Sequence, residues 1–227
     1  MTRAHLFAPD EQELSEHYPN RHEWTADGIV HAFGIFLAII GGGVLFFIAW
    51  ERGGPALATT AMLYALCLIA MLACSAAYNL TRPSPARRIL RRLDEAAIFL
   101  LIAGSYTPFT VQHFDGWHAY AVTGAVWAIA LAGVFGKVFL GKVHEVIWCV
   151  FYVAFGWLSV LILPPISSAM PFVALALLAA GGLIYTSGVL VFLSPKAPFR
   201  RAIWHGFVLV GAALHYGAIL LDITHVA

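Results

Sequence analysis

Seven apolar stretches, separated by short polar segments, dominate this sequence and limit what it can fold into. Each is about as long as the ~20 helical residues that cross the roughly 30 Å hydrocarbon core of a bilayer. The chain is 61% hydrophobic and 11% charged, which is far from the composition of a soluble domain. The sequence therefore predicts an all-α integral membrane bundle of seven transmembrane helices. The predicted spans are Gly28–Trp50, Pro55–Asn79, Leu93–Val111, Trp117–Phe139, Val143–Leu163, Pro171–Leu193 and Ala202–Ile223.

The basic residues indicate which side of the membrane each loop faces. Of the 13 Lys and Arg residues, all but Arg52 fall in the N-terminal tail and in the second, fourth and sixth loops. Short loops rich in Lys and Arg stay in the cytoplasm. We therefore expect a multi-pass membrane protein with a cytoplasmic N-terminus and a C-terminus outside. The same pattern divides the chain into a cytoplasmic tail, residues 1–27, and a transmembrane domain, residues 28–227.

The second loop carries a cluster of arginines between Arg82 and Arg92. A basic cluster next to a span is typical of contact with anionic lipid headgroups, which we favour over nucleic acid. The predicted partners are membrane lipids, including a lipid ligand or substrate, and not nucleic acid. The three cysteines all lie inside predicted spans and indicate no disulfide framework.

Polar residues inside the spans are the candidates for function, because ionisable side chains in a bilayer are costly and often mark a site. Most of them fall at one depth, near the cytoplasmic ends of the first, second, third and seventh spans. His215 is the exception, because it lies about 15 Å deeper than His205 at 1.5 Å per helical residue. The candidate pocket residues are His31, Ser75, Asn79, Asp94, Glu95, Arg201, His205 and His215.

Each candidate also has a purely structural alternative. Asp94 and the residue after it can cap the third span and favour its dipole. Asn79 can end the second span as a C-cap, and His31 and His215 can be hydrogen-bonded packing residues. His113, in the loop between the third and fourth spans, is expected to be solvated.

Several of these residues belong to segments that resemble a known family. Leu93–Phe109, with the sequence LDEAAIFLLIAGSYTPF, resembles the third-span signature of the hemolysin III proteins. These are the bacterial branch of the progestin and adipoQ receptor (PAQR) family, within a ceramidase-like superfamily. Ser75–Asn79 resembles the second-span Ser-x-x-x-His motif, and Arg201–His205 resembles the seventh-span His-x-x-x-His motif. Glu23-Trp24 and His31 match the start of the family's first span.

The resemblance implies a zinc ion held by three histidines, with a serine and an aspartate beside it. Its metal-bound water is proposed to hydrolyse amide or ester bonds in lipids. At the matching positions Ser75 and Asp94 are retained as catalytic candidates, but His205 is the only retained metal ligand. Asn79 and Arg201 stand at the other two positions. Because asparagine is a weak zinc ligand and arginine a permanent cation, these substitutions count against zinc.

Two functions remain. We favour a non-hydrolytic lipid-binding or membrane-homeostasis protein with a degenerate zinc site, in which Arg201 replaces the metal and pairs with Asp94 or Glu95. The alternative is a metal-dependent lipid amidase or esterase, similar to a ceramidase, that combines His205 with Asp94, Glu95 or His31. Pore formation has no support, because no span shows a wide polar stripe or a ring of charge.

Overall fold

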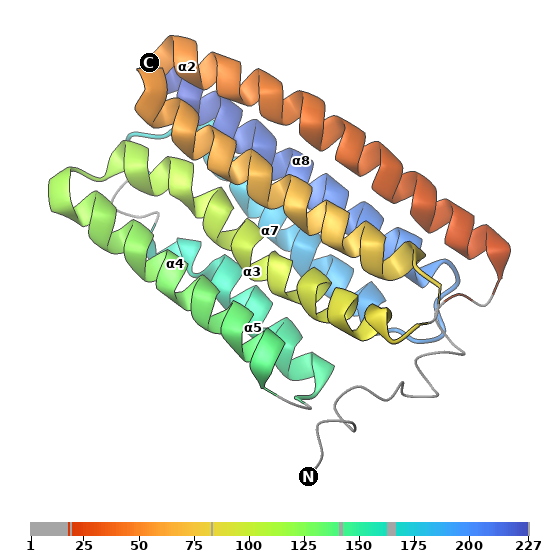
Figure 1. Ribbon diagram of the computed structural model, residues 1–227. Coiled ribbons are helices and arrows are strands. Elements are labelled where there is room, and N and C mark those ends of the chain that lie inside the picture. The colour runs from red at the N-terminus through yellow and green to blue at the C-terminus, as the bar shows by residue number, and fades with distance from the viewer. Residues whose placement is uncertain (1–17, 19, 83, 141–142, 163–166, 227) are drawn as a thin grey trace.

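The computed structural model describes residues 18, 20–82, 84–140, 143–162 and 167–226. Within these residues the regular structure is entirely helical, which confirms the all-α class, and the helices lie side by side in one elongated bundle (Figure 1). Residues 1–17 and 19 of the predicted tail lie outside the described part, whereas Arg21–Asp27 already belongs to the first helix. The helices are α2 (Arg21–Leu80), α3 (Ala86–His113), α4 (Gly116–Phe139), α5 (Glu145–Trp157), α6 (Ser159–Ile162), α7 (Phe172–Phe192) and α8 (Arg200–Val226).

Helix α2 consists of two segments that meet at Gly54. A straight helix of its 60 residues would measure about 90 Å. Gly54 has φ 66° and ψ −160°, a conformation open to glycine but not to other residues, and Pro55 follows it. The second segment turns back along the first (Figure 1). A Cβ placed on Gly42 would lie only 2.8 Å from Cβ of Ala65, so glycine lets the two segments pack closely.

The remaining helices assemble around this pair. Helix α2 packs against α3 and α8, α3 packs against α4, and α7 packs against α8. Helix α5 contacts α3 and α7. The start of α2, the start of α8 and the loop between α2 and α3 lie at one end of the bundle, opposite the turn at Gly54 (Figure 1).

The distribution of side chains is that of a membrane protein. Large apolar side chains face outward, for example Phe33 at 57% and Phe47 at 64% exposure. Among the described residues, α2, α4, α5 with α6, α7 and α8 are long and apolar enough to cross a membrane. Several ionisable groups lie inside the bundle, where lipid cannot reach them. The buried polar residues are Asp27, His31, Thr60, Ser75, Asn79, Arg87, Thr107, Thr110, His205 and Asp222.

The helix boundaries exclude two of the structural alternatives. Helix α3 begins at Ala86, two turns before Asp94, so neither Asp94 nor Glu95 caps it. Asn79 does not end α2, because the C-cap position is Thr81 and Asn79 lies within the last helical turn. Its side chain is directed into the bundle, as described below.

The expectation that His113 is solvated is wrong. Its side chain is 4% exposed, and its Nε2 lies 2.9 Å from the Asp222 carboxylate of α8. Gln112 Nε2 also donates to that carboxylate, at 3.2 Å. These contacts join the end of α3 to the end of α8. His113 is therefore a buried partner of the Asp222 carboxylate, a role that the local sequence around His113 does not reveal.

Candidate functional site

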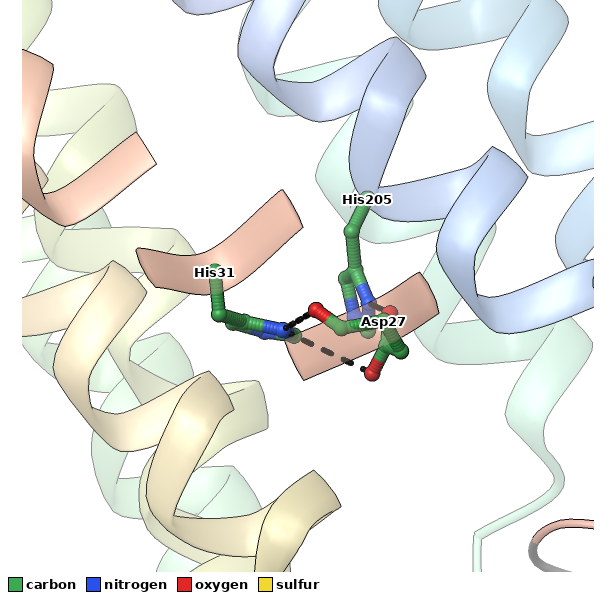
Figure 2. A group of neighbouring side chains, drawn as sticks. All are labelled: Asp27, His31 and His205. Atoms are coloured by element: carbon green, nitrogen blue, oxygen red, sulfur yellow. Dashed lines mark hydrogen bonds and ion pairs between the residues drawn. The ribbon is translucent and has the colours of Figure 1, made fainter. Parts of the chain in front are cut away.

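The centre of the site is formed by Asp27, His31 and His205 (Figure 2). Asp27 and His31 lie one turn apart on the first segment of α2, and His205 lies on α8. His205 Nδ1 is 2.6 Å from Asp27 Oδ1. His31 Nδ1 is 2.9 Å from the Asp27 backbone oxygen and 3.5 Å from its Oδ2. The three residues are 0%, 2% and 8% exposed, so the carboxylate and both imidazoles are held out of solvent.

Ser75, from the second segment of α2, lies between the two imidazoles. Its Oγ is 3.1 Å from Nε2 of His31 and 3.3 Å from Nε2 of His205. The two rings meet edge to face, with centroids 4.3 Å apart. A hydroxyl carries a single proton, so only one of the two Nε2 atoms can accept it. The other Nε2 is therefore placed to hold a further proton or a cation, whose charge the Asp27 carboxylate would balance.

Asn79 connects Ser75 to Arg201. The Asn79 side-chain nitrogen donates to the Ser75 backbone oxygen at 3.0 Å and to its Oγ at 3.2 Å. Arg201 Nη1 donates to Asn79 Oδ1 at 3.2 Å. The two positions that carry histidine ligands in the family resemblance are thus hydrogen-bonded directly to each other.

Tyr18 contacts both Asp27 and Arg201. Its hydroxyl donates to Asp27 Oδ2, and the Arg201 guanidinium lies 5.8 Å from the centre of its ring. Burial, and then the neighbouring Asp27 carboxylate, raises the pKa of the Tyr18 phenol far above its usual value. The phenol therefore stays protonated and remains a hydrogen-bond donor.

A cavity of about 490 Å³ opens beside these residues, between the second segment of α2 and helices α3, α5, α7 and α8. Its polar part includes Ser75, Asn79, Asp94, Arg201 and His205. Apolar and aromatic side chains form much of the remaining wall, among them Tyr64, Met71, Leu72, Leu101, Phe109, Trp157, Leu178 and Val208. The structure therefore brings the second-, third- and seventh-span candidates to one cavity.

Glu95 also lines this cavity, but its partners differ from those expected. It pairs with Arg91 at 2.8 Å and with Lys137, and Arg91 also pairs with Glu145. The Asn79 amide and the Tyr18 ring lie against the Arg201 guanidinium. Asp94 and Arg201 line the same cavity, and the expected balancing of their charges stays a prediction.

His215 lies in a separate part of the cavity wall. Its ring packs edge-on against Tyr185, with centroids 5.3 Å apart, and against Gly181 of α7. It takes no part in the cluster around His205, which agrees with the greater depth expected from its position in the seventh span.

Asp27 is the residue that the sequence reasoning missed. Its closest imidazole, that of His205, lies 178 positions away in the chain. The available signal was local. Asp27 and His31 have the i, i+4 spacing that places both side chains on one helix face, and an acid at the start of an apolar span is costly unless it is paired.

The two possible metal-ligand sets differ in their chemistry. Asn79, Arg201 and His205 do not fit zinc, because they offer one imidazole, one amide and a permanent cation. Asp27, His31 and His205 offer one carboxylate and two imidazoles whose ligand atoms lie within 4.8 Å of one another. This donor set fits a divalent ion such as zinc.

Comparisons with known proteins agree with the membrane architecture and with the motifs. The family model described as "Haemolysin-III related" matches residues 20–216. The chain is 29% identical over 198 residues to a hemolysin-3 homolog of Bacillus subtilis (strain 168), covering 87% of this chain and 93% of that protein. It is 29% identical over 205 residues to hemolysin-3 of Bacillus cereus, covering 90% and 94%.

A human protein is similar as well. Monocyte to macrophage differentiation factor of Homo sapiens is 30% identical over 210 residues, covering 88% of this chain and 84% of that protein. No solved structure matches. The family match spans every element of the bundle from α2 into α8, including Asp27, Ser75 and His205. The chain therefore belongs to the haemolysin-III-related, PAQR-like family of membrane proteins.

Proposed function

We propose that this protein binds a lipid in the cavity beside His205, and that it does so without a zinc ion at the family's ligand positions or hydrolysis by metal-bound water. The observation that carries this proposal is the hydrogen bond between Arg201 and Asn79. A fixed positive charge at Arg201 repels a metal ion and occupies one of its ligand positions. The guanidinium then supplies at this place the positive charge that zinc would otherwise supply.

The cavity supports a lipid as the ligand class. Its volume lies within the range of about 300–1,000 Å³ typical of small-molecule sites. An apolar wall with charged and polar groups in one part matches an amphiphile, whose chain contacts the wall while its polar end contacts Arg201, Asp94 and His205. The role that follows is lipid binding or maintenance of the membrane.

The proposal is tested by native mass spectrometry of the detergent-solubilised protein, using two matched substitutions on α7. Ala176 and Ala179 are both exposed, but only Ala179 lines the cavity. We expect a co-purified lipid adduct in the unmodified protein and in Ala176→Phe, and loss of the adduct in Ala179→Phe. An adduct that survives Ala179→Phe unchanged would place the lipid elsewhere and contradict the proposal.

A second function is favoured by a different observation, the grouping of Asp27, His31 and His205. If these residues hold zinc, the ion supplies an activated water for cleavage of lipid amides or esters. Zinc in the purified protein that disappears in His31→Ala would support this metal-dependent amidase or esterase. Zinc that is absent from both proteins would exclude it.

We infer seven membrane crossings: the two segments of α2, then α3, α4, α5 continued by α6, α7 and α8. The clustering of basic residues supports a cytoplasmic N-terminus in the bacterial inner membrane. Alkaline phosphatase is active only outside the cytoplasm, so a fusion after Ala227 should be active and one at Lys196 inactive. The reverse pattern would overturn this orientation.

A further inference from the structure

We propose that Ser75, His205 and Asp27 form a metal-independent nucleophilic triad that cleaves a carboxylic ester or amide of the lipid in the cavity. The inference rests on the proposed lipid binding and adds a reaction to it. It requires no zinc, so the substitutions at the family's ligand positions do not argue against it.

The contacts follow the order of a carboxylate–imidazole–hydroxyl triad. Asp27 Oδ1 is 2.6 Å from His205 Nδ1, and His205 Nε2 is 3.3 Å from Ser75 Oγ. A carboxylate at Nδ1 holds the proton there and leaves the lone pair of Nε2 facing the hydroxyl. That is the tautomer a general base needs in order to take the serine proton.

The burial of the three residues matches their roles. Ser75 and His205 line the cavity, so a bound substrate can reach both. Asp27 is fully buried and is not among the lining residues, so its carboxylate is shielded from the substrate. His31 also contacts the Ser75 hydroxyl, but its Nδ1 is closest to a backbone oxygen and it does not line the cavity. His205 is therefore the better placed base.

The Arg201 guanidinium lines the cavity close to the nucleophile and supplies a fixed positive charge for a developing oxyanion. The Asn79 side-chain nitrogen is 3.2 Å from Ser75 Oγ, and the Arg201 guanidinium is bonded to the same amide. A fixed positive charge beside the reacting carbonyl stabilises the tetrahedral intermediate. The pair that replaces two metal ligands would thus take over the metal's electrostatic role.

The reaction is balanced with water as the second substrate. Ser75 Oγ attacks the lipid carbonyl carbon while its proton passes to His205 Nε2. The bond from that carbon to the leaving oxygen or nitrogen breaks, and the leaving group takes the proton from Nε2. Water then gives a proton to Nε2 and attacks the acyl-serine ester. The fatty acid leaves, and Ser75 Oγ regains its proton.

The test is labelling of the purified full-length protein by an alkyl fluorophosphonate, which reacts with activated serines, in the presence of EDTA. We expect the label on Ser75, mapped by peptide mass spectrometry, with a rate that the chelator does not change. Asp27→Asn should slow labelling by about 100-fold or more, as loss of a triad carboxylate does. Ser187→Ala is the control, because Ser187 lies outside the cavity with its hydroxyl on the Leu183 backbone oxygen, and its rate should equal that of the unmodified protein.

Three results would overturn the triad: no label on Ser75, a label that requires added zinc, or an unchanged rate in Asp27→Asn. The position of the label in the unmodified protein decides the question even if Asp27→Asn fails to fold. Lipid adducts in native mass spectra separate the two proposals. Protein that carries lipid but is not labelled refutes the triad alone, whereas absence of a lipid adduct from Ser75→Ala, which cannot cleave the lipid, refutes the proposed lipid binding.

Discussion

Arg201 of α8 donates a hydrogen bond from Nη1 to Oδ1 of Asn79, near the end of α2, at 3.2 Å. The two residues are 122 positions apart in the chain, and both line the cavity beside Ser75. Since Asn79 also donates to Ser75, the guanidinium is linked through one amide to the hydroxyl between the two histidines. This chain of contacts joins α8 to the second segment of α2 at the polar part of the cavity.

The first prediction concerns the coupling between these two residues. A double-mutant cycle of Arg201→Ala and Asn79→Ala should give an interaction energy of about 1–3 kcal/mol, because the bond is charge-assisted and shielded from solvent. The measurement is unfolding in a denaturing detergent titration.

The control for this cycle is Arg201→Ala combined with Glu95→Gln. Glu95 pairs with Arg91 and Lys137 rather than with Arg201, so these two substitutions should be additive within about 0.5 kcal/mol. Strong coupling to Glu95 and none to Asn79 would restore the ion pair expected from the sequence and contradict the geometry.

The second prediction uses the neighbouring glycines Gly42 and Gly43. Gly42→Ala should destabilise the protein by about 1–3 kcal/mol, because the new methyl would lie 2.8 Å from the Ala65 Cβ and force the two segments of α2 apart. Nothing lies within 4 Å of a Cβ on Gly43, so Gly43→Ala should be neutral or slightly stabilising. Thermal unfolding of both variants in the same detergent checks this. Equal effects would mean that the two segments do not pack as described.

The third prediction concerns the buried pair of His113 and Asp222. Asp222→Ala should cost about 3–5 kcal/mol, because it leaves the buried His113 imidazole without its carboxylate partner and removes one of the two acceptors of Gln112. His118→Ala, an exposed histidine five residues further along the chain, should change stability by less than about 0.5 kcal/mol. A small loss for Asp222→Ala would show that water reaches this end of the bundle.

The fourth prediction compares the two ends of the charged network on α3, α4 and α5. Lys137 is 9% exposed and pairs with Glu95, so Lys137→Met should lower stability by about 1–3 kcal/mol. Glu145 is 46% exposed, and Glu145→Gln should cost less than about 1 kcal/mol, an effect that salt reduces further. Chemical unfolding at low and high salt measures both. A larger loss at Glu145 would contradict the burial of the network.

Much of the architecture could be predicted because its signals are local. Apolar length predicts helices that suit a membrane, and Gly54 with Pro55 falls at the predicted boundary between the first two spans. The common depth of Ser75, Asp94 and His205 also follows from span length alone, and the structure places all three on one cavity.

The features that could not be predicted from the sequence depend on contacts between segments that are distant in the chain. Asp27 lies before the first predicted span, and only the packing of α8 against α2 brings His205 to its carboxylate. His113 is at the end of α3 beside a loop, and the carboxylate that pairs with its buried imidazole belongs to Asp222 of α8. The hydrogen bond between Arg201 and the Asn79 amide likewise depends on the packing of α8 against α2. Spacing rules place residues at a depth, whereas the partners at that depth depend on how the helices pack.

The central claim is that the Arg201–Asn79 pair has replaced zinc at the family's ligand positions. The most direct test is zinc content, measured by inductively coupled plasma mass spectrometry, of the purified protein beside an Asn79→His/Arg201→His variant. We predict negligible zinc in the unmodified protein and about one zinc per chain in the variant, where His205 would complete a three-histidine site. About one zinc per chain in the unmodified protein would show that the Arg201–Asn79 pair has not displaced the metal and would contradict the claim.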